Sequence, residues 1–357
     1  MPHNTTAEQR LGSPLPSKRD EVWKWTDLRR AVTDKAGGLT SAARPKFDLP
    51  HGVKIREGEG PEKQSKKYGH GTMAALAKSF GGKSWEIYVP SGLRPAAPLV
   101  ISDIARGHCR IMIMVDKGAH IHLFEHYGGE QGGFTNSDIQ IHLAEGAKLT
   151  RTIIQDDPAD HCRIANAHIA IEEGAKLTQH CLAFGGGLVR METNLTSEGE
   201  GVTADMGAAY LLSGERHCDM TSVIRLAHPN CTIDQAVKGV VDDKTRGVFQ
   251  GKFLVERAAQ HTDAQMRHDA LMLSDRAQVR AKPELEIYAD DVACEHGNTL
   301  GQLDETSLFY MRQRGIPIAQ ARAMLTEAFV SSVFDSVEDD DLRESLLVKV
   351  REWLEAR

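Results

Sequence analysis

The sequence lacks the features of a membrane-spanning or secreted protein. No apolar run approaches the ~20 residues that a membrane-spanning helix needs, and segment 1–10 is polar where a signal peptide would be apolar. An excess of basic residues is also missing. The net charge of −7 and the pI near 6.2 argue against nucleic acid as a partner. We therefore expect a cytoplasmic protein without a membrane span.

The cysteines lack the spacing of a self-contained metal site, because no two of them form a C-x-x-C pair. Free cysteine is among the most buried residue types, so we expect most of them to be reduced core residues. The six cysteines are Cys109, Cys162, Cys181, Cys218, Cys231 and Cys294.

Sequence motifs of several enzyme classes are missing as well. There is no G-x-S-x-G, no P-loop and no G-x-G-x-x-G. The glycine runs at 128–133 and 185–187 are interpreted as corner loops and not as phosphate-binding loops.

What the sequence does contain is a repeat with a period of 28 residues. E-G-A-K-L-T occurs at 145–150 and again at 173–178, and a related D-K-G-A lies at 116–119. A strand-length segment precedes each copy, and apolar residues alternate along it with a period of two, as in a strand with one buried face. Repeats of this length that stack on one another indicate a solenoid.

Aligning the three copies places apolar residues in common columns. We expect these columns to be buried stacks and the Gly-Ala pairs to mark a turn at a fixed place. The columns are Ile111, Ile139 and Ala167; Ile113, Ile141 and Ile169; and Val115, Leu143 and Ile171.

The expected fold is mainly β, a parallel β-helix (solenoid) flanked by N-terminal and C-terminal helical segments. We assign residues 1–89 to an N-terminal helical and loop segment, 90–302 to the β-helix and 303–357 to a C-terminal helical domain. In the first segment a helix is predicted over 17–34, and loops over 35–70. In the last, helices are predicted from the Asp304 cap to Gly315, over 317–333, and after the acidic run 338–341.

The stretch G-A-H-I-H-L-F-E-H at 118–126 resembles the histidine motif of cupins, because His120 and His122 alternate on one strand face. Its glutamate comes one residue too early, however, and no partner motif with a third histidine follows. The same columns hold lysine and threonine in later repeats. A cupin-type metal enzyme and a carbohydrate-active β-solenoid enzyme remain open as alternatives; the role of His126 beside the pair is also open.

Several collinear motifs resemble the SufB/SufD family, closely over about 200–340 and loosely over the rest of the solenoid. They are W-K-W-T-D-L at 23–28, G-V-F-Q-G-K-F at 247–253, Q-H-T-D-A-Q at 260–265, L-M-L-S-D-R-A at 271–277, P-E-L-E-I-Y-A-D-D-V-A-C-E-H-G at 283–297 and L-D-E-T-S-L-F-Y-M-R-Q-R-G-I at 303–316.

The resemblance implies a β-helix between helical segments and a non-enzymatic scaffold role in SUF iron–sulfur cluster assembly. It implies two partners, a SufB-like paralogue and a SufC-like ABC ATPase that binds the ATP. Gly297 follows the histidine where SufB-type sequences tend to have glutamate, and His268 is the nearest match to a SufB cysteine. The SufD branch is therefore favoured, with a SufB-type paralogue as the alternative. Whether the isolated chain forms a homodimer is left open.

Two sets of site residues follow from the resemblance. His296 is expected to face the partner paralogue and to supply one ligand to a transient iron–sulfur cluster at the interface, with no cofactor held by the isolated chain. Cys294 lies on the same strand face. The C-terminal helices are expected to bind the ATPase, through an apolar and flexible surface. The residues expected on that surface are Leu308, Met311, Met324, Leu325, Ala328 and Phe329.

Overall fold

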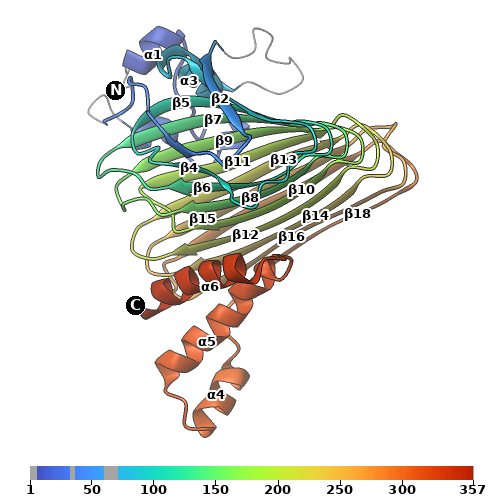
Figure 1. Cartoon of the computed structure of the whole chain (residues 1–357). Helices are drawn as coiled ribbons and strands as arrows, with labels where there is room; N and C mark the ends of the chain where they lie inside the picture. Colours follow the sequence, from blue (N-terminus) through green and yellow to red (C-terminus); the bar gives the residue numbers. More distant parts are fainter. Residues whose placement is uncertain (1–5, 33–36, 60–70, 357) are drawn as a thin grey trace.

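The computed structural model describes residues 6–32, 37–59 and 71–356. Its centre is a stack of strands in two nine-stranded sheets, and from β3 (Ser84–Val89) onward consecutive strands alternate between the two sheets (Figure 1). In order, the first sheet contains β1 (Lys46–Asp48), β4 (Leu99–Ser102), β6 (His120–Tyr127), β8 (Lys148–Gln155), β10 (Lys176–Ala183), β12 (Thr203–Leu212), β14 (Thr232–Val241), β16 (Thr262–Met272) and β18 (Val292–Gly301).

The second sheet runs alongside and supplies the other half of each rung. In order, it contains β17 (Gln278–Ile287), β15 (Arg246–Val255), β13 (His217–Leu226), β11 (Leu188–Ser197), β9 (Cys162–Ile171), β7 (Phe134–Leu143), β5 (Gly107–Val115), β3 (Ser84–Val89) and β2 (Lys54–Gly58).

All neighbouring strands pair in parallel except at the first rung, where β1 pairs with β4 and β2 with β3 in the antiparallel sense. The fold is therefore a parallel β-solenoid, as the repeat predicts. Strands β1, β2 and β3 belong to the sheets although they precede residue 90, so the sheets extend into the segment that we expected to be helical and looped. Five of the six free cysteines are buried, and Cys294 is partly buried.

The predicted columns are present as predicted. Ile113 pairs with Ile141, which pairs with Ile169, and no more than 2% of any of these side chains is exposed. The Gly-Ala turns also recur at one place in the rung. Gly118, Gly146 and Gly174 all have positive φ angles, between 61° and 65°, a conformation that glycine adopts without the penalty of a β-carbon.

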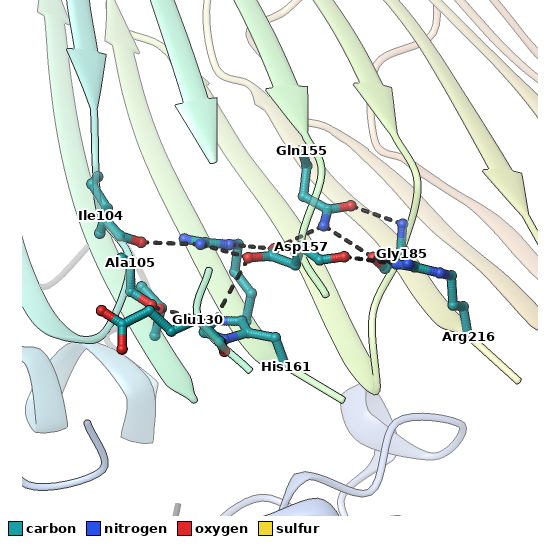
Figure 2. Close-up of polar contacts among 10 residues, drawn as sticks. Ile104, Ala105, Glu130, Gln155, Asp157, His161, Gly185 and Arg216 are labelled. Carbon is teal, nitrogen blue, oxygen red and sulfur yellow. Dashed lines mark hydrogen bonds and ion pairs between the residues drawn. The ribbon is translucent and has the colours of Figure 1, made fainter. Parts of the chain in front are cut away.

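Polar networks join the rungs at their corners (Figure 2). The Arg163 guanidinium donates to both carboxylate oxygens of Asp157, at 2.7 and 2.8 Å, and to the Ile104 carbonyl oxygen at 3.0 Å. Burial works to raise the pKa of the Asp157 carboxyl, but the charge and hydrogen bonds of Arg163 outweigh it and the pKa is lowered. The Arg163 guanidinium thus joins the corner before β9 to the backbone at Ile104, before β5.

The N-terminal segment differs from the prediction. It forms α1 (Thr6–Leu11), the short 3-10 helix η1 (Glu21–Trp23), α2 (Leu28–Ala31) and α3 (Thr72–Phe80), so the continuous helix expected over 17–34 is wrong. The helical conformation is interrupted at Thr26. Its hydroxyl forms hydrogen bonds with His217, at 3.1 Å, and with Asp219 in the solenoid. The loops expected over 35–70 contain β1 and β2; residues 60–70 lie outside the described part of the chain.

The three predicted C-terminal helices are confirmed as α4 (Glu305–Gln313), α5 (Ile318–Ser331, continued by the 3-10 helix η2, Ser332–Phe334) and α6 (Asp340–Glu355). The Asp304 side chain accepts from the backbone amides of residues 306 and 307, as expected of an N-cap. Helix α6 lies along the solenoid, and α5 and α4 project from it as a hairpin (Figure 1). No helix within the described residues is long and apolar enough to cross a membrane.

We predict that Ile113→Asp lowers the free energy of unfolding by on the order of 3 kcal/mol or more, because it buries an unpaired carboxylate in the central column. Met114→Asp is the matched control, because the next side chain on β5 points outward and is 42% exposed. The control should change stability by less than about 1 kcal/mol. Equal losses in urea denaturation would contradict the burial of this column.

Candidate functional site at the last rung

The solenoid ends on an open rung. Strand β18 pairs with β16, and β17 pairs with β15; neither has a second neighbour in the described part of the chain. Each therefore presents unpaired backbone N–H and C=O groups along one edge. Large apolar side chains lie at this end as well, since Tyr288 is 55% and Leu300 is 50% exposed. The C-terminal helices pack on the side of the sheet and leave this rung accessible.

His296 lies on this open rung, in the middle of β18. Its strand position is in register with Met266, a buried residue of the interior column, and Cys294 is in register with Ala264. His296 and Cys294 thus share the inward face of β18, as the alternation predicts. Unlike Ala264 and Met266, they have no further rung stacked on them in the described part of the chain. His296 is exposed, while Cys294 packs against the solenoid core.

The environment of Cys294 favours the protonated thiol. Burial raises its pKa, and the carboxylate of Asp263 raises it further. A thiol that is largely protonated is a weak metal ligand. On this face of the chain, the imidazole of His296 is therefore a more accessible metal ligand than the Cys294 thiol.

His268, on the neighbouring strand β16, is buried and forms a hydrogen bond with Asn298 of β18. Its ring stacks on Phe249, with centroids 4.8 Å apart and planes 7° apart. The Tyr210 hydroxyl lies 2.9 Å from Nε2, and Nδ1 lies 2.7 Å from the Asn298 amide oxygen. Since an amide oxygen only accepts, Nδ1 carries the proton and donates, and Nε2 accepts from the tyrosine. Burial lowers the pKa of His268, which keeps it neutral.

The last rung does not contain a complete metal site by itself. Among the described residues, no group of three or more His, Cys, Asp or Glu side chains is arranged to hold a metal ion. That holds also for the cupin-like stretch. There His120 and His122 stack on Lys148 and Thr150, and the His122 Nε2 lies 3.0 Å from the Thr152 hydroxyl.

The α4–α5 hairpin is the second candidate surface. Of the residues expected there, Leu308, Met311 and Leu325 pack into the core of the hairpin together with Leu303 and Ala321, and this core also packs against Leu271 and Leu273 of the solenoid. Phe329 packs against the solenoid and lies under the Lys238 ammonium, 4.7 Å from the ring centroid.

The exposed part of the hairpin includes Met324, which is 46% exposed, and Ala328. The larger exposed apolar side chains on it were missed from sequence: Phe309 is 63%, Tyr310 58% and Ile318 46% exposed. The unbroken apolar run from Leu308 to Met311 was the signal that could have found them, because one face of a helix cannot bury four consecutive side chains. An apolar surface of this kind on a projecting hairpin is typical of a protein-binding site.

A protein-family model described as "SUF system FeS cluster assembly, SufBD core domain" matches residues 101–329. The chain belongs to this family. The iron–sulfur cluster assembly protein SufD of Escherichia coli is 28% identical, over 97% of this chain and 91% of that protein. An iron–sulfur cluster assembly SufBD family protein of Synechocystis is 29% identical, over 92% and 85% of the two chains. Protein ABCI7 of Arabidopsis thaliana, a chloroplast protein, is 25% identical over 96% and 83%.

These similarities confirm the resemblance to the SufB/SufD family and, within it, to SufD. They extend beyond the matched core and cover both helical segments. The open last rung and the projecting hairpin are therefore features of a SufD-like protein of the SUF system.

We predict that Asn298→Ala loosens β18, because it removes the acceptor for the buried His268 donor and costs about 1 kcal/mol. Backbone amides of β18 should exchange with deuterium faster, while those of β12 and β14 keep their protection. Glu295→Ala is the control, since this side chain on the same strand is exposed. If both variants exchange like the unmodified protein, Asn298 does not hold the strand.

Proposed function

We propose that this protein is a scaffold subunit of the SUF complex without catalytic activity of its own, working in the cytoplasm. It pairs with a SufB-like paralogue through its last rung and binds a SufC-like ABC ATPase through the α4–α5 hairpin. The observation that carries the proposal is the open rung with His296 on its accessible face. Family membership favours this function over a carbohydrate-active solenoid enzyme.

The open rung supports pairing because its edges offer rows of unpaired backbone donors and acceptors, although Pro283 of β17 has no N–H to donate. A second solenoid that ends in the same way can continue both sheets by strand addition. The exposed Tyr288 and Leu300 would become buried in such an interface. Edge strands that stay open expose a protein to aggregation, so a partner at this place also explains why the end has no cap.

His296 would then lie within the interface, where its imidazole supplies one ligand to an iron–sulfur cluster. The cluster is the cargo of the complex, and its other ligands come from the partner. Imidazole is a suitable ligand for iron. The incomplete set of donors on this chain fits a shared site from which a cluster is later released.

We predict that His296→Ala leaves the complex assembled but lowers cluster maturation in cells severalfold, because an exposed histidine contributes little to folding. Maturation is measured as the activity of a cluster-dependent reporter enzyme in cells that rely on this SUF system. Co-purification of the SufB-like and SufC-like subunits shows that assembly is intact. Glu295→Ala, on the outward face of β18, should mature clusters normally. Normal maturation in the His296 variant would make this histidine dispensable.

The ATPase is proposed to bind the exposed apolar face of the hairpin. Phe309, Ile318 and Met324 come from both helices, and the hairpin core holds these helices together. Burial of large apolar and flexible side chains supplies most of the binding free energy of such interfaces.

We predict that Phe309→Asp combined with Met324→Asp weakens ATPase binding at least tenfold, because it places two charges in the apolar interface. Both side chains point to solvent, so the helical circular dichroism should not change. Val348→Asp is the matched control: this residue of α6 is 39% exposed and lies outside the hairpin. Unchanged affinity of the double variant, measured by calorimetry, would place the docking surface elsewhere.

A further inference from the structure

A large groove lies between the N-terminal segment and the corner where β13, β15 and β17 begin. Its volume is about 830 Å³, within the range of small-molecule sites. Seven basic residues and two acidic residues line it, although the chain as a whole has a net charge of −7. Positive charge is thus concentrated in a groove that lies outside the hairpin and reaches the last rung only at the start of β17.

The solenoid wall of the groove presents a ladder of cations from three successive rungs. Arg216 immediately precedes β13, Lys244 and Arg246 lie at the start of β15, and Arg280 lies near the start of β17. Successive rungs are about 4.8 Å apart, the spacing of paired strands. A ligand with several anionic groups can therefore contact more than one rung at once.

The opposite wall comes from the N-terminal segment, with Lys18, Lys24 and Arg30 around the half-buried Trp25. This segment is firmly attached to the solenoid. The Thr26 hydroxyl lies 3.1 Å from His217 Nε2, and the Glu21 carboxylate forms an ion pair with Lys282 at 2.8 Å. The groove is therefore formed by two fixed walls.

The positive charges are largely uncompensated. Arg216 donates to the backbone carbonyls of Asp157 and Gly185, at 2.7 and 2.9 Å (Figure 2), and keeps its charge. Lys244 pairs with Glu215. The side chains of Arg30, Arg246 and Arg280 form no hydrogen bond or ion pair with the described part of the chain, as is also true of Lys18.

We propose that this groove binds a small molecule that carries two or more phosphate groups. Arginine recognises phosphate through paired, charge-assisted hydrogen bonds, and several exposed arginines converge here. Trp25 is half-buried in the groove with the Lys24 ammonium 5.6 Å from its ring centroid, and an aromatic ring among cations suits a ligand that also contains a ring. Two sources of this chemistry are a free polyphosphate and a nucleoside diphosphate or triphosphate.

The test is calorimetric titration of the full chain with pyrophosphate, ADP and a polyglutamate peptide at moderate ionic strength. We expect pyrophosphate and ADP to bind. Arg246→Ala with Arg280→Ala should weaken both at least tenfold. A matched control is Arg257→Ala, an exposed arginine in the turn after β15, outside the groove. It should bind both ligands as the unmodified chain does. Unchanged thermal melting shows that the variants are folded.

The outcomes separate the two sources. If ADP binds more tightly than pyrophosphate and Trp25→Ala removes the difference, the ligand is a nucleotide. If the two bind equally in every variant, phosphate groups alone are recognised. Failure of both to bind, or equal weakening in the Arg257 control, would overturn the proposal. It would also be overturned if only polyglutamate binds, because the groove would then receive an acidic protein segment.

Discussion

The in-register stacking of parallel rungs is the constraint on which the rest of this structure depends. Each rung forms backbone hydrogen bonds with the rung before it and places its apolar residues in the same columns. Ile113, Ile141 and Ile169 form one such column. The same geometry leaves every new rung with one open edge. At the start of the solenoid the antiparallel strands β1 and β2 occupy the two edges. At the other end β17 and β18 stay open, so the means by which the solenoid grows is also the means by which it can join a second one.

The solenoid could be predicted from the sequence because the contacts between its rungs recur at a regular sequence separation. Within the repeat a residue finds its neighbour 28 positions away, as Ile113 and Ile141 do, and the alternation shows which face is buried. The N-terminal segment could not be predicted in this way. Its periodic apolar residues indicate a helix, but the hydroxyl of Thr26 binds Asp219, which lies 193 positions further along the chain. Contacts of this range leave no periodic trace, and here they outweigh the local preference for helix.

The candidate sites could likewise be predicted only in part, because local patterns identify a face but not what lies against it. Strand alternation correctly places Cys294 and His296 on one face, but only the sheet order shows that no further described strand pairs with β18 beyond them. In the hairpin, the helical pattern identifies an apolar stripe without showing what the stripe contacts. Leu308 and Leu325 turn out to pack within the chain, whereas Phe309 faces solvent. A sequence pattern therefore reports that a residue needs an apolar neighbour, and the structure decides whether the neighbour comes from the same chain.

The two surfaces of the proposed complex are connected through a short series of contacts. Phe329 of α5 lies against the Lys238 ammonium of β14, which pairs with Asp269 of β16 at 2.6 Å. The other oxygen of Asp269 accepts from the Thr299 hydroxyl of β18 at 2.5 Å. Thr299 is on the strand that carries His296, three residues away. Each of these contacts involves a charge or a hydrogen bond with a defined direction, so they form a continuous series between the hairpin and the last rung. The helix α5 and the strand that carries His296 are thus joined by direct contacts and not only through the length of the chain.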